Sequence, residues 1–366
     1  LSFTVARDGE TLVAPSEMAL TLSTGEVLGE SPRVRSARRR AVTETIDAPL
    51  YRQSRFDAAY NELDLRLRGD YGILARAYDD GVCYRFYTER DGELTIVDET
   101  AQLNFEGDPS AYIPYSKTEI PMRTSFENTY EYAPLSKFRT QTVAFMPVLV
   151  DLGERGYVLY TESDVEAYPG VYLTYDKEAK GFAARFAEYP TETSLTKRFQ
   201  DVVERSADYI ARVDGRRSYP WRIVAYAATA TVNDMVWQTA EASRVADASW
   251  VRDGKIAWDW WNNWGVYGVD FKSGINTETY KYFIDFAAAN GIEYVALDEG
   301  WGVRDGDVMH VVPEIDLPEI VSYAREKKVG IILWVVAKVL DDKLEEACRY
   351  YSELGVAGWK VDFIDR

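Results

Sequence analysis

IAWDWW at residues 256–261 begins a series of four apolar segments that decide the fold of the C-terminal third. The others are IEYVAL at 292–297, GIILW at 330–334 and GWKVDF at 358–363. Helical patterns separate these segments, so they are predicted to be parallel strands of βα units. Four units also fit a doubly wound sheet, but no glycine-rich phosphate loop follows the first strand, so a (β/α)₈ (TIM) barrel is favoured.

The helices between these strands have recognisable ends. Asn276 precedes the first helical pattern, which is expected to end near Asn290. Asp316 precedes the second, with a proline in its first turn and a glutamate three residues on, as is typical of a helix start. DKLE at 342–345 is expected to open the third helix.

The C-terminal region is too short for a closed barrel. A complete barrel takes about 250 residues, whereas 116 residues follow Trp250 (366 minus 250). Residues 251–366 are therefore expected to form the N-terminal half of a catalytic barrel, with about four βα units. The other half of the barrel is expected on the same parent polypeptide.

Residues 1–225 follow a different pattern, in which short strands alternate with polar turns. YGILARAY at 71–78 and VCYRFY at 82–87 flank an Asp-Asp-Gly turn, which is typical of a β-hairpin because Asp-Gly adopts the positive φ angles of a tight turn. Many strands with short turns indicate a large antiparallel β-sandwich. Further strands are expected at 94–97, 142–152, 156–161 and 171–175.

Two stretches near the middle of the chain have apolar residues at helical spacing. Apolar residues recur at helical intervals over 195–213, and 231–241 contains a second, shorter helical pattern. Residues 226–250 are expected to be a linker region between the sandwich domain and the half-barrel.

Composition excludes several classes of function. The chain has 60 acidic and 42 basic residues, a net charge of −18, so a polyanion such as nucleic acid would be repelled. It has no apolar run of about 18 residues that could span a membrane. The single histidine, His310, excludes a mechanism that needs several imidazoles, and Cys83 and Cys348 lack metal-ligand spacing.

Polar and aromatic side chains follow the predicted strands at their C-terminal ends, where barrel enzymes carry catalytic groups. The first strand ends in WDWWNNW at 258–264 and the second in DEGW at 298–301. Trp334 and Lys338 follow the third, and KVDFID at 360–365 ends the fourth. Carboxylates, a lysine and tryptophans on one rim predict a sugar pocket, in which charged hydrogen bonds hold the hydroxyls above an aromatic floor.

Six segments of the chain resemble glycoside hydrolase family 97. They cover nearly the whole chain, in the same order as in the family. The resemblance implies an α-glucosidase or α-galactosidase of the kind found in Bacteroidetes-type bacteria, with a β-super-sandwich, a barrel and a small C-terminal β domain. The segments are YDDGVCYRF (78–86), TESDVEAYPG (161–170), AWDWWN (257–262), GINTETYKYF (274–283), LDEGW (297–301) and KVDFIDR (360–366).

The residues at the end of the fourth strand distinguish two branches of that family. Inverting members lack the aspartate there, whereas KVD at 360–362 resembles the retaining branch and its α-galactosidases. The resemblance implies that Asp362 is the nucleophile of a double displacement, and that Lys360 holds substrate hydroxyls and helps to keep Asp362 ionised. The acid/base is then a glutamate beyond Arg366, about 5–5.5 Å from Asp362 in a retaining enzyme, and this chain alone is expected to be inactive.

The resemblance also assigns substrate-binding residues. Asp298, Glu299 and Trp301 resemble the Asp-Asp-Gly-Trp motif of families 27 and 36, which binds the 4- and 6-hydroxyls of galactose, with glutamate in place of the second aspartate. Trp260 and Trp334 are expected to contact the sugar as well.

Calcium is the expected cofactor. Glu162, in TESD at 161–164, matches the ligand that the family's sandwich domain gives to a calcium ion close to the active site. Calcium prefers several carboxylate oxygens, and the other ligands are expected beyond the end of this chain. The ion would organise the pocket and polarise a hydroxyl or a water molecule.

Together these features predict an exo-acting retaining α-galactosidase whose substrate is an α-linked galactosyl, or alternatively glucosyl, oligosaccharide. Two alternatives remain open: an inverting α-glucosidase of the same family, and a carbohydrate-binding protein without catalysis. The stereochemistry of the product distinguishes the first, and absence of turnover the second. The family, together with a start at Leu1 without an apolar leader segment, predicts a periplasmic or secreted protein.

Overall fold

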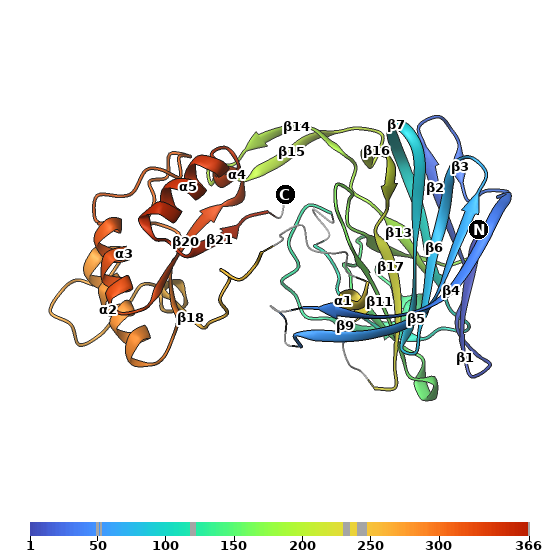
Figure 1. The fold of residues 1–366 in the computed structure, drawn as a ribbon, viewed down its shortest axis with the longest axis horizontal. Coiled ribbons are helices and arrows are strands. Elements are labelled where there is room, and N and C mark those ends of the chain that lie inside the picture. The colour runs from blue at the N-terminus through green and yellow to red at the C-terminus, as the bar shows by residue number, and fades with distance from the viewer. Residues whose placement is uncertain (49–50, 52, 118–121, 230–234, 240–246, 365–366) are drawn as a thin grey trace. The chain divides into compact units, whose positions relative to one another are not determined.

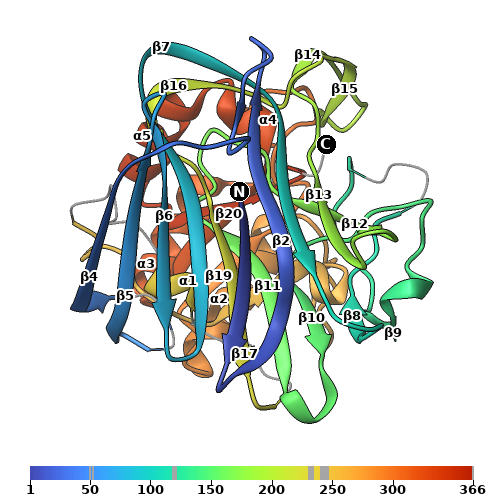
Figure 2. The same ribbon diagram turned by 90° about the vertical axis from the view of Figure 1, so that its right-hand side faces the viewer.

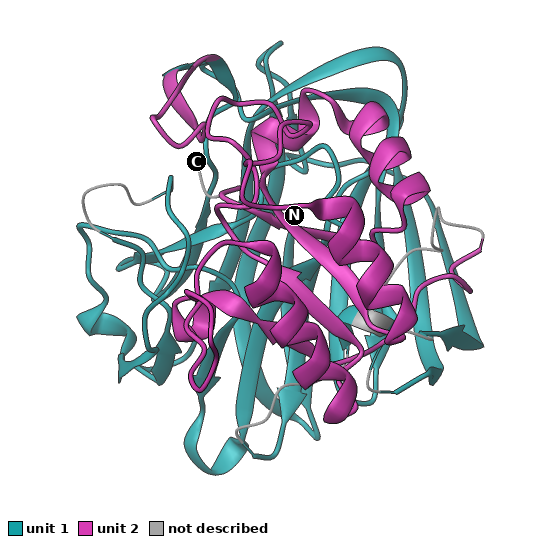
Figure 3. Cartoon of the chain, turned by 90° about the vertical axis from the view of Figure 1, so that its left-hand side faces the viewer, with its two compact units in different colours: residues 1–191, 205–244 teal, residues 192–204, 245–366 magenta. Residues whose placement is uncertain are grey.

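The computed structural model consists mainly of β-strands, antiparallel in the N-terminal part and parallel near the C-terminus (Figure 1). It describes residues 1–48, 51, 53–117, 122–229, 235–239 and 247–364. The chain divides into two compact units (Figure 3): unit 1 is Leu1–Thr191 with Arg205–Arg244, and unit 2 is Glu192–Glu204 with Val245–Arg366. Unit 2 therefore includes a short segment from within the sandwich part of the sequence.

The described strands of unit 1 form a connected antiparallel network of 15 strands (Figure 2). Its main path runs in the order β4-β5-β6-β7-β17-β11-β10-β8-β9. The 24-residue strand β7 pairs with β6 and β17 near its start and with β2 and β13 near its end. The strands are β1 (Ser2–Arg7), β2 (Glu10–Leu22), β3 (Val27–Leu28), β4 (Val34–Asp47), β5 (Arg55–Leu67), β6 (Tyr71–Tyr78), β7 (Gly81–Asn104), β8 (Ser110–Ile113), β9 (Glu131–Pro134), β10 (Val148–Asp151), β11 (Tyr157–Ser163), β12 (Tyr172–Asp176), β13 (Gly181–Arg185), β16 (Ala211–Ser218) and β17 (Trp221–Ala227).

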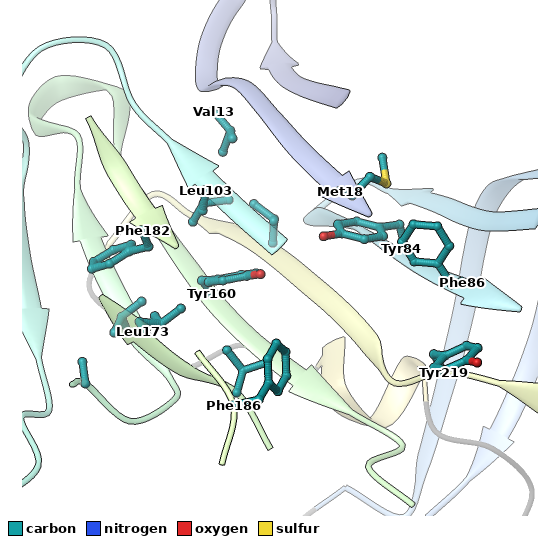
Figure 4. Close-up of a cluster of buried hydrophobic side chains, with 14 of the residues drawn as sticks. Val13, Met18, Tyr84, Phe86, Leu103, Tyr160, Leu173, Phe182, Phe186 and Tyr219 are labelled. Carbon is teal, nitrogen blue, oxygen red and sulfur yellow. The ribbon is translucent and has the colours of Figure 1, made fainter. Parts of the chain in front are cut away.

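The core of unit 1 is formed by side chains at alternate positions of these strands. In β16, for example, Ala211, Val213 and Gly215 are buried while Arg212 and Asp214 between them are exposed, as a pleated strand with one face inward requires. The main cluster brings together Val13, Leu103 and Phe182, which lie far apart in the sequence (Figure 4). Removal of this apolar surface from water is the main force that stabilises the unit.

The predicted hairpin at 71–87 is confirmed, although the role of its glycine differs from the prediction. Tyr78 pairs with Gly81, so the turn consists of the two residues between them and Gly81 already belongs to β7. A Cβ atom at position 81 would collide with the Met235 sulfur and with the backbone of Val224. Close packing, rather than a positive φ angle, explains the glycine.

The helix predicted over 195–213 is wrong. This region contains the hairpin strands β14 (Pro190–Leu195) and β15 (Asp201–Ser206), followed by β16. The apolar residues that suggested a helix come from three separate strands, and within β16 burial alternates with a period of two. Pairing with β7 satisfies the backbone of β16, which a sequence window cannot reveal.

Residues 226–250 do not form a simple linker. β17 continues to Ala227, and helix α1 (Met235–Gln238) packs on β5, β11 and β17, with Met235 buried beside Trp221. Unit 1 includes this helix. Helix α1 lies inside the helix predicted at 231–241, whose positions 231–234 and 240–241 are outside the described residues.

Unit 2 contains a four-stranded parallel sheet in the sequential order β18-β19-β20-β21. Helices α2 and α3 follow β18 and β19, as successive βα units predict. The elements are β18 (Ile256–Trp258), the 3₁₀ helix η3 (Asp259–Asn262), α2 (Thr277–Ala289), β19 (Tyr294–Leu297), α3 (Leu317–Glu326), β20 (Gly330–Val336), α4 (Ala337–Asp341), α5 (Leu344–Leu354) and β21 (Gly358–Asp362).

The three predicted helix starts are confirmed, and two of them have a side-chain cap. The Asn276 side chain accepts a hydrogen bond from the Thr279 amide at 2.9 Å, and Asp316 accepts one from the Glu319 amide at 3.0 Å. The third helix, α5, begins at Leu344 within the predicted segment 342–345, but no side chain caps it, and the additional helix α4 precedes it. Among the helices in the described ranges, none is long and apolar enough to cross a membrane.

The first strand is shorter than predicted. β18 ends at Trp258, and the chain then turns into η3. The cause is Asp259, whose carboxylate is directed inward and accepts a hydrogen bond from the Tyr280 hydroxyl at 2.7 Å. Trp260 and Trp261 consequently lie in η3 and not in the predicted strand.

Candidate active site

The carboxyl ends of β18, β19, β20 and β21 carry the residues that the sequence singled out. Asp298 follows β19, Trp334 lies in β20, and Lys360 and Asp362 lie in β21. Parallel strands end at one edge of a sheet, so these side chains come together. Lys338, on α4, instead pairs with Asp342 along the helix. Asp365 and Arg366, the last residues of the KVDFIDR segment, are outside the described residues.

Asp362 is a partly exposed carboxylate with fixed hydrogen bonds. Its Oδ2 accepts from the Trp334 indole at 2.9 Å and its Oδ1 from the Phe363 amide at 2.8 Å, and the side chain is 40% exposed. Partial burial raises the pKa of Asp362, but the two hydrogen bonds and the charge of Lys360 outweigh burial and bring the pKa below its ordinary value. Asp362 is therefore ionised and accessible at neutral pH.

Lys360 connects two carboxylates. Its Nζ lies 2.6 Å from Asp298 Oδ2 and 3.7 Å from Asp362 Oδ2. The same ammonium group lies 4.4 Å from the centre of the Trp258 ring, a distance at which a cation is attracted by an aromatic face. One positive charge thus lies close to both aspartates and favours the ionised state of Asp362.

Asp298 is the buried member of this group. Only 3% of it is exposed, and its Oδ2 accepts from Lys360 and, at 2.5 Å, from the Trp258 indole. Its Oδ1 accepts from the Glu299 amide at 2.8 Å. A buried carboxylate with this many donors has a fixed orientation.

Asp259 is a site residue that the sequence did not single out, although it lies in the WDWW segment. It is fully buried, and the Asp298 amide approaches both of its carboxylate oxygens at 3.2 Å. Burial raises the pKa of Asp259 to about 6, although hydrogen bonds from Tyr280 and from the Asp298 amide act in the opposite direction. A strand-end aspartate followed by tryptophans was the available signal, but only the structure reveals its burial.

We predict a pH-dependent stability contribution from Asp259. Its pKa is near 6 in the folded protein and about 3.9 when unfolded. The contribution is fully present below pH 4 and is lost as the pH rises through 6, by on the order of 3 kcal/mol. Urea unfolding at pH 4 and pH 7 should show the free-energy difference between wild type and Asp259→Asn falling by about that amount. A difference that stays constant with pH would contradict the assignment.

Glu299 lies between two arginines. Its Oε2 is 2.6 Å from Arg198 Nη2 and its Oε1 is 3.0 Å from Arg304 Nη2. The following residue, Gly300, has a φ of +120°, and a Cβ atom there would collide with Ile275. The positive φ therefore explains the glycine of the DEGW segment, whereas the end of the Ile275 side chain could move aside.

The predicted aromatic residues occupy three different environments. Trp301 is 3% exposed and belongs to the core of unit 2, where its indole donates to the Trp334 carbonyl at 2.8 Å. Trp334 is 9% exposed and bonds to Asp362. Trp260 is 51% exposed and stacks on Trp258, with ring centres 5.4 Å apart. Among these, Trp260 offers an open aromatic face of the kind that packs on a sugar.

Glu162, the predicted calcium ligand, is already engaged in unit 1. Its Oε2 lies 2.6 Å from Arg222 Nη1, and its Oε1 accepts from the Val171 amide at 3.0 Å. Burial raises the pKa of Glu162, and the charge of Arg222 offsets only part of that effect. A carboxylate has about four acceptor positions. Glu162 can therefore also offer an oxygen to a metal ion. However, within the described ranges no three His, Cys, Asp or Glu side chains form a metal-binding group.

The chain matches two models of one family. Residues 1–240 match the "Glycosyl-hydrolase 97 N-terminal" model and residues 260–366 match the "Glycoside hydrolase 97" model. The matches together cover almost the entire chain.

Two curated proteins are similar over the full chain. One, named "Retaining alpha-galactosidase", from Bacteroides thetaiotaomicron, is 42% identical over 378 residues, which are 57% of its own length. Another, "Probable retaining alpha-galactosidase" from Streptomyces bingchenggensis, is 29% identical over 54% of its length. The chain thus spans little more than half the length of these relatives.

A solved structure supports the fold. A "Glycoside Hydrolase Family 97 enzyme in complex with Acarbose" from Pseudoalteromonas sp. strain K8 superposes with a TM-score of 0.80 at 18% identity, covering 99% of this chain and 56% of the other.

Proposed function

Because the chain belongs to glycoside hydrolase family 97, we propose that it is part of a retaining α-galactosidase that removes terminal α-linked galactose from oligosaccharides. The observation that carries the proposal is Asp362, an accessible carboxylate that lies at the end of β21 and whose pKa is below its ordinary value. The 42% identity to a protein named as a retaining α-galactosidase supports the same reaction.

In the proposed mechanism Asp362 attacks the anomeric carbon of the sugar. A bond forms between this carbon and a carboxylate oxygen while the glycosidic bond breaks, and an acid/base carboxyl transfers its proton to the leaving oxygen. Water then attacks the same carbon and gives a proton to the deprotonated acid/base, while the bond to Asp362 breaks and the α configuration is restored. The hydrogen bonds from Trp334 and Phe363 hold Asp362 in one orientation, and Lys360 favours its charged form.

The acid/base is proposed to lie outside this chain, about 5–5.5 Å from Asp362. We also propose that the four βα units of unit 2 are the first half of a (β/α)₈ barrel that the rest of the polypeptide closes. The sequential order β18-β19-β20-β21 supports this, since neighbouring strands of such a barrel follow one another in the chain. A preparation limited to residues 1–366 should therefore give no detectable turnover of an α-galactoside, and measurable turnover would contradict this placement.

Proton NMR of the complete polypeptide tests the reaction. Hydrolysis of p-nitrophenyl α-galactoside should release α-galactose first, with the β anomer arising later by mutarotation. Early β anomer would indicate inversion, and turnover of the α-glucoside alone would indicate the α-glucosidase alternative. Sugar binding without turnover would indicate a binding protein.

We propose that Glu162 contributes one oxygen to a calcium site that residues beyond the described part complete. Calcium accepts carboxylate oxygens, and Glu162 has unused acceptor positions. When bound, the ion would organise the pocket and polarise a hydroxyl or water.

Melting temperatures of the complete polypeptide test the calcium site. Calcium should raise the melting temperature of wild type relative to a chelator, because a ligand that binds only the folded state stabilises it. Glu162→Gln should lose most of this response, whereas Glu178→Gln, an exposed carboxylate on the same unit, should retain it. Equal responses in both variants would remove Glu162 from the site.

We further propose a periplasmic or secreted location, which rests on the family to which the chain belongs. Fractionation of the native bacterium with an antibody to this chain tests it: recovery with cytoplasmic markers would contradict the proposal.

A further inference from the structure

The β14–β15 hairpin contributes an arginine to the candidate site. Its segment Glu192–Glu204 belongs to unit 2, although it lies in the sandwich part of the sequence. The turn is held by the Thr196 hydroxyl, which accepts from the amides of Arg198 and Gln200 at 3.1 Å each. Arg198 therefore projects from a turn with fixed backbone geometry.

Arg198 contacts two strand ends of the rim. Its Nη2 donates to Glu299 Oε2 at 2.6 Å, just after β19. Its guanidinium also lies 4.8 Å from the centre of the Phe363 ring, just after β21. The arginine thereby connects Glu299 to the residue that follows Asp362.

Two arginines occupy the carboxylate of Glu299. Both of its carboxylate oxygens carry an arginine partner, and its side chain is 17% exposed. This geometry favours an anchoring role for Glu299 over contact with substrate hydroxyls.

Phe363 is the residue that Arg198 contacts at the end of β21. Its φ is +56°, a left-handed conformation that costs energy for a residue other than glycine and needs support from its surroundings. The ring packs edge-to-face on Trp334, with centres 5.6 Å apart, and lies against Arg198. In this conformation the Phe363 amide donates to Asp362 Oδ1 at 2.8 Å.

We infer that Arg198 and Glu299 are positioning residues, which hold Phe363 so that its amide stays on the Asp362 carboxylate. The inference rests on the proposed function, because it assigns Asp362 as the nucleophile. It replaces the expectation that Glu299 binds the sugar directly.

Kinetics of Arg198→Ala, Arg198→Lys and Glu299→Gln in the complete polypeptide test this inference. Arg198→Ala and Glu299→Gln should each lower kcat by roughly tenfold with little change in KM, because a misplaced reacting group slows the chemical step. The double variant should be no slower than either single one, since the two residues act as a unit. Arg198→Lys should recover part of the loss because it keeps the charge. Arg216→Ala, which removes an exposed arginine–carboxylate pair with the same 2.6 Å distance, is the control.

The pH profile adds a readout that general loss of packing would not move. Loss of the Phe363 hydrogen bond raises the pKa of Asp362, so the acidic limb of kcat/KM should shift to higher pH in Arg198→Ala and Glu299→Gln but not in Arg216→Ala. An unchanged acidic limb, or a higher KM at constant kcat in Glu299→Gln, would overturn the inference in favour of direct sugar contact.

An activity-independent measurement separates this inference from the proposed function. Carboxyl ¹³C NMR, with Asp362→Asn to assign the signal, should show a higher pKa for Asp362 in Arg198→Ala than in wild type. If wild type fails to hydrolyse α-galactosides while this shift occurs, the reaction assignment is wrong and the positioning role stands. If hydrolysis occurs without the shift, the positioning role is wrong.

Discussion

Asp362→Asn should lower kcat/KM of the complete polypeptide for an α-galactoside by about 10⁴-fold or more, the scale expected when a covalent nucleophile is removed. The amide has nearly the same shape as the carboxylate and can still accept hydrogen bonds from Trp334 and Phe363. It has no negative charge, however, and cannot form the covalent ester with the sugar. The rates of both variant and wild type are measured with p-nitrophenyl α-galactoside.

Two controls separate lost chemistry from lost structure. Asp285→Asn changes a carboxylate paired with Lys327 and Tyr323 on the outer helices and should retain wild-type rates. Asp362→Ala with added azide should recover turnover, because azide can attack the anomeric carbon from the face that Asp362 has vacated and displace the leaving group. The product would be β-galactosyl azide. Activity of Asp362→Asn within tenfold of wild type would remove Asp362 from the mechanism.

Asp298→Asn is expected to lower kcat/KM by about 10²–10³-fold, because several interactions in the site depend on this one buried charge. Asp298 accepts from the Trp258 indole and holds Lys360 at 2.6 Å, while Lys360 lies 3.7 Å from Asp362. Without the Asp298 charge, Lys360 is free to pair more closely with Asp362, which would make the carboxylate a weaker nucleophile. The steady-state rates are measured as for Asp362→Asn.

The acidic limb of the pH profile checks this explanation. A closer Lys360 stabilises the ionised form of Asp362 more strongly, so the limb should shift to lower pH in Asp298→Asn. The shift is opposite to that expected for Arg198→Ala, which distinguishes the two effects. Rates within threefold of wild type, with no shift, would mean that Asp298 serves only to stabilise the fold.

Local features of the fold were predictable from the sequence. The side-chain caps Asn276 and Asp316 and the turn between β6 and β7 depend on a few neighbouring residues, and the structure has them where the sequence indicated. The parallel order of β18 to β21 follows from alternating strands and helices. The helix expected over 195–213 failed because strand pairing with distant β7 outweighs local spacing.

Some residues of the candidate site could likewise be predicted from the sequence, and others could not. Asp298, Lys360 and Asp362 could be found because they stand at predicted strand ends. The burial of Asp259 depends on Tyr280, and the partner of Glu299 is Arg198, which is 101 residues away in the sequence. Trp301 was expected at the sugar but lies in the core, because an aromatic residue suits either place and the pattern does not distinguish them.

The most direct test of the account is to trap the covalent intermediate on the complete polypeptide. 5-Fluoro-α-galactosyl fluoride would react with loss of fluoride from the anomeric carbon, and the added fluorine at carbon 5 slows hydrolysis of the ester. Mass spectrometry of a proteolytic digest should then locate the sugar on the peptide that contains Asp362, and fragmentation should place it on that residue. A label on Asp298, Glu299 or any other carboxylate would contradict the assignment of Asp362 as the nucleophile.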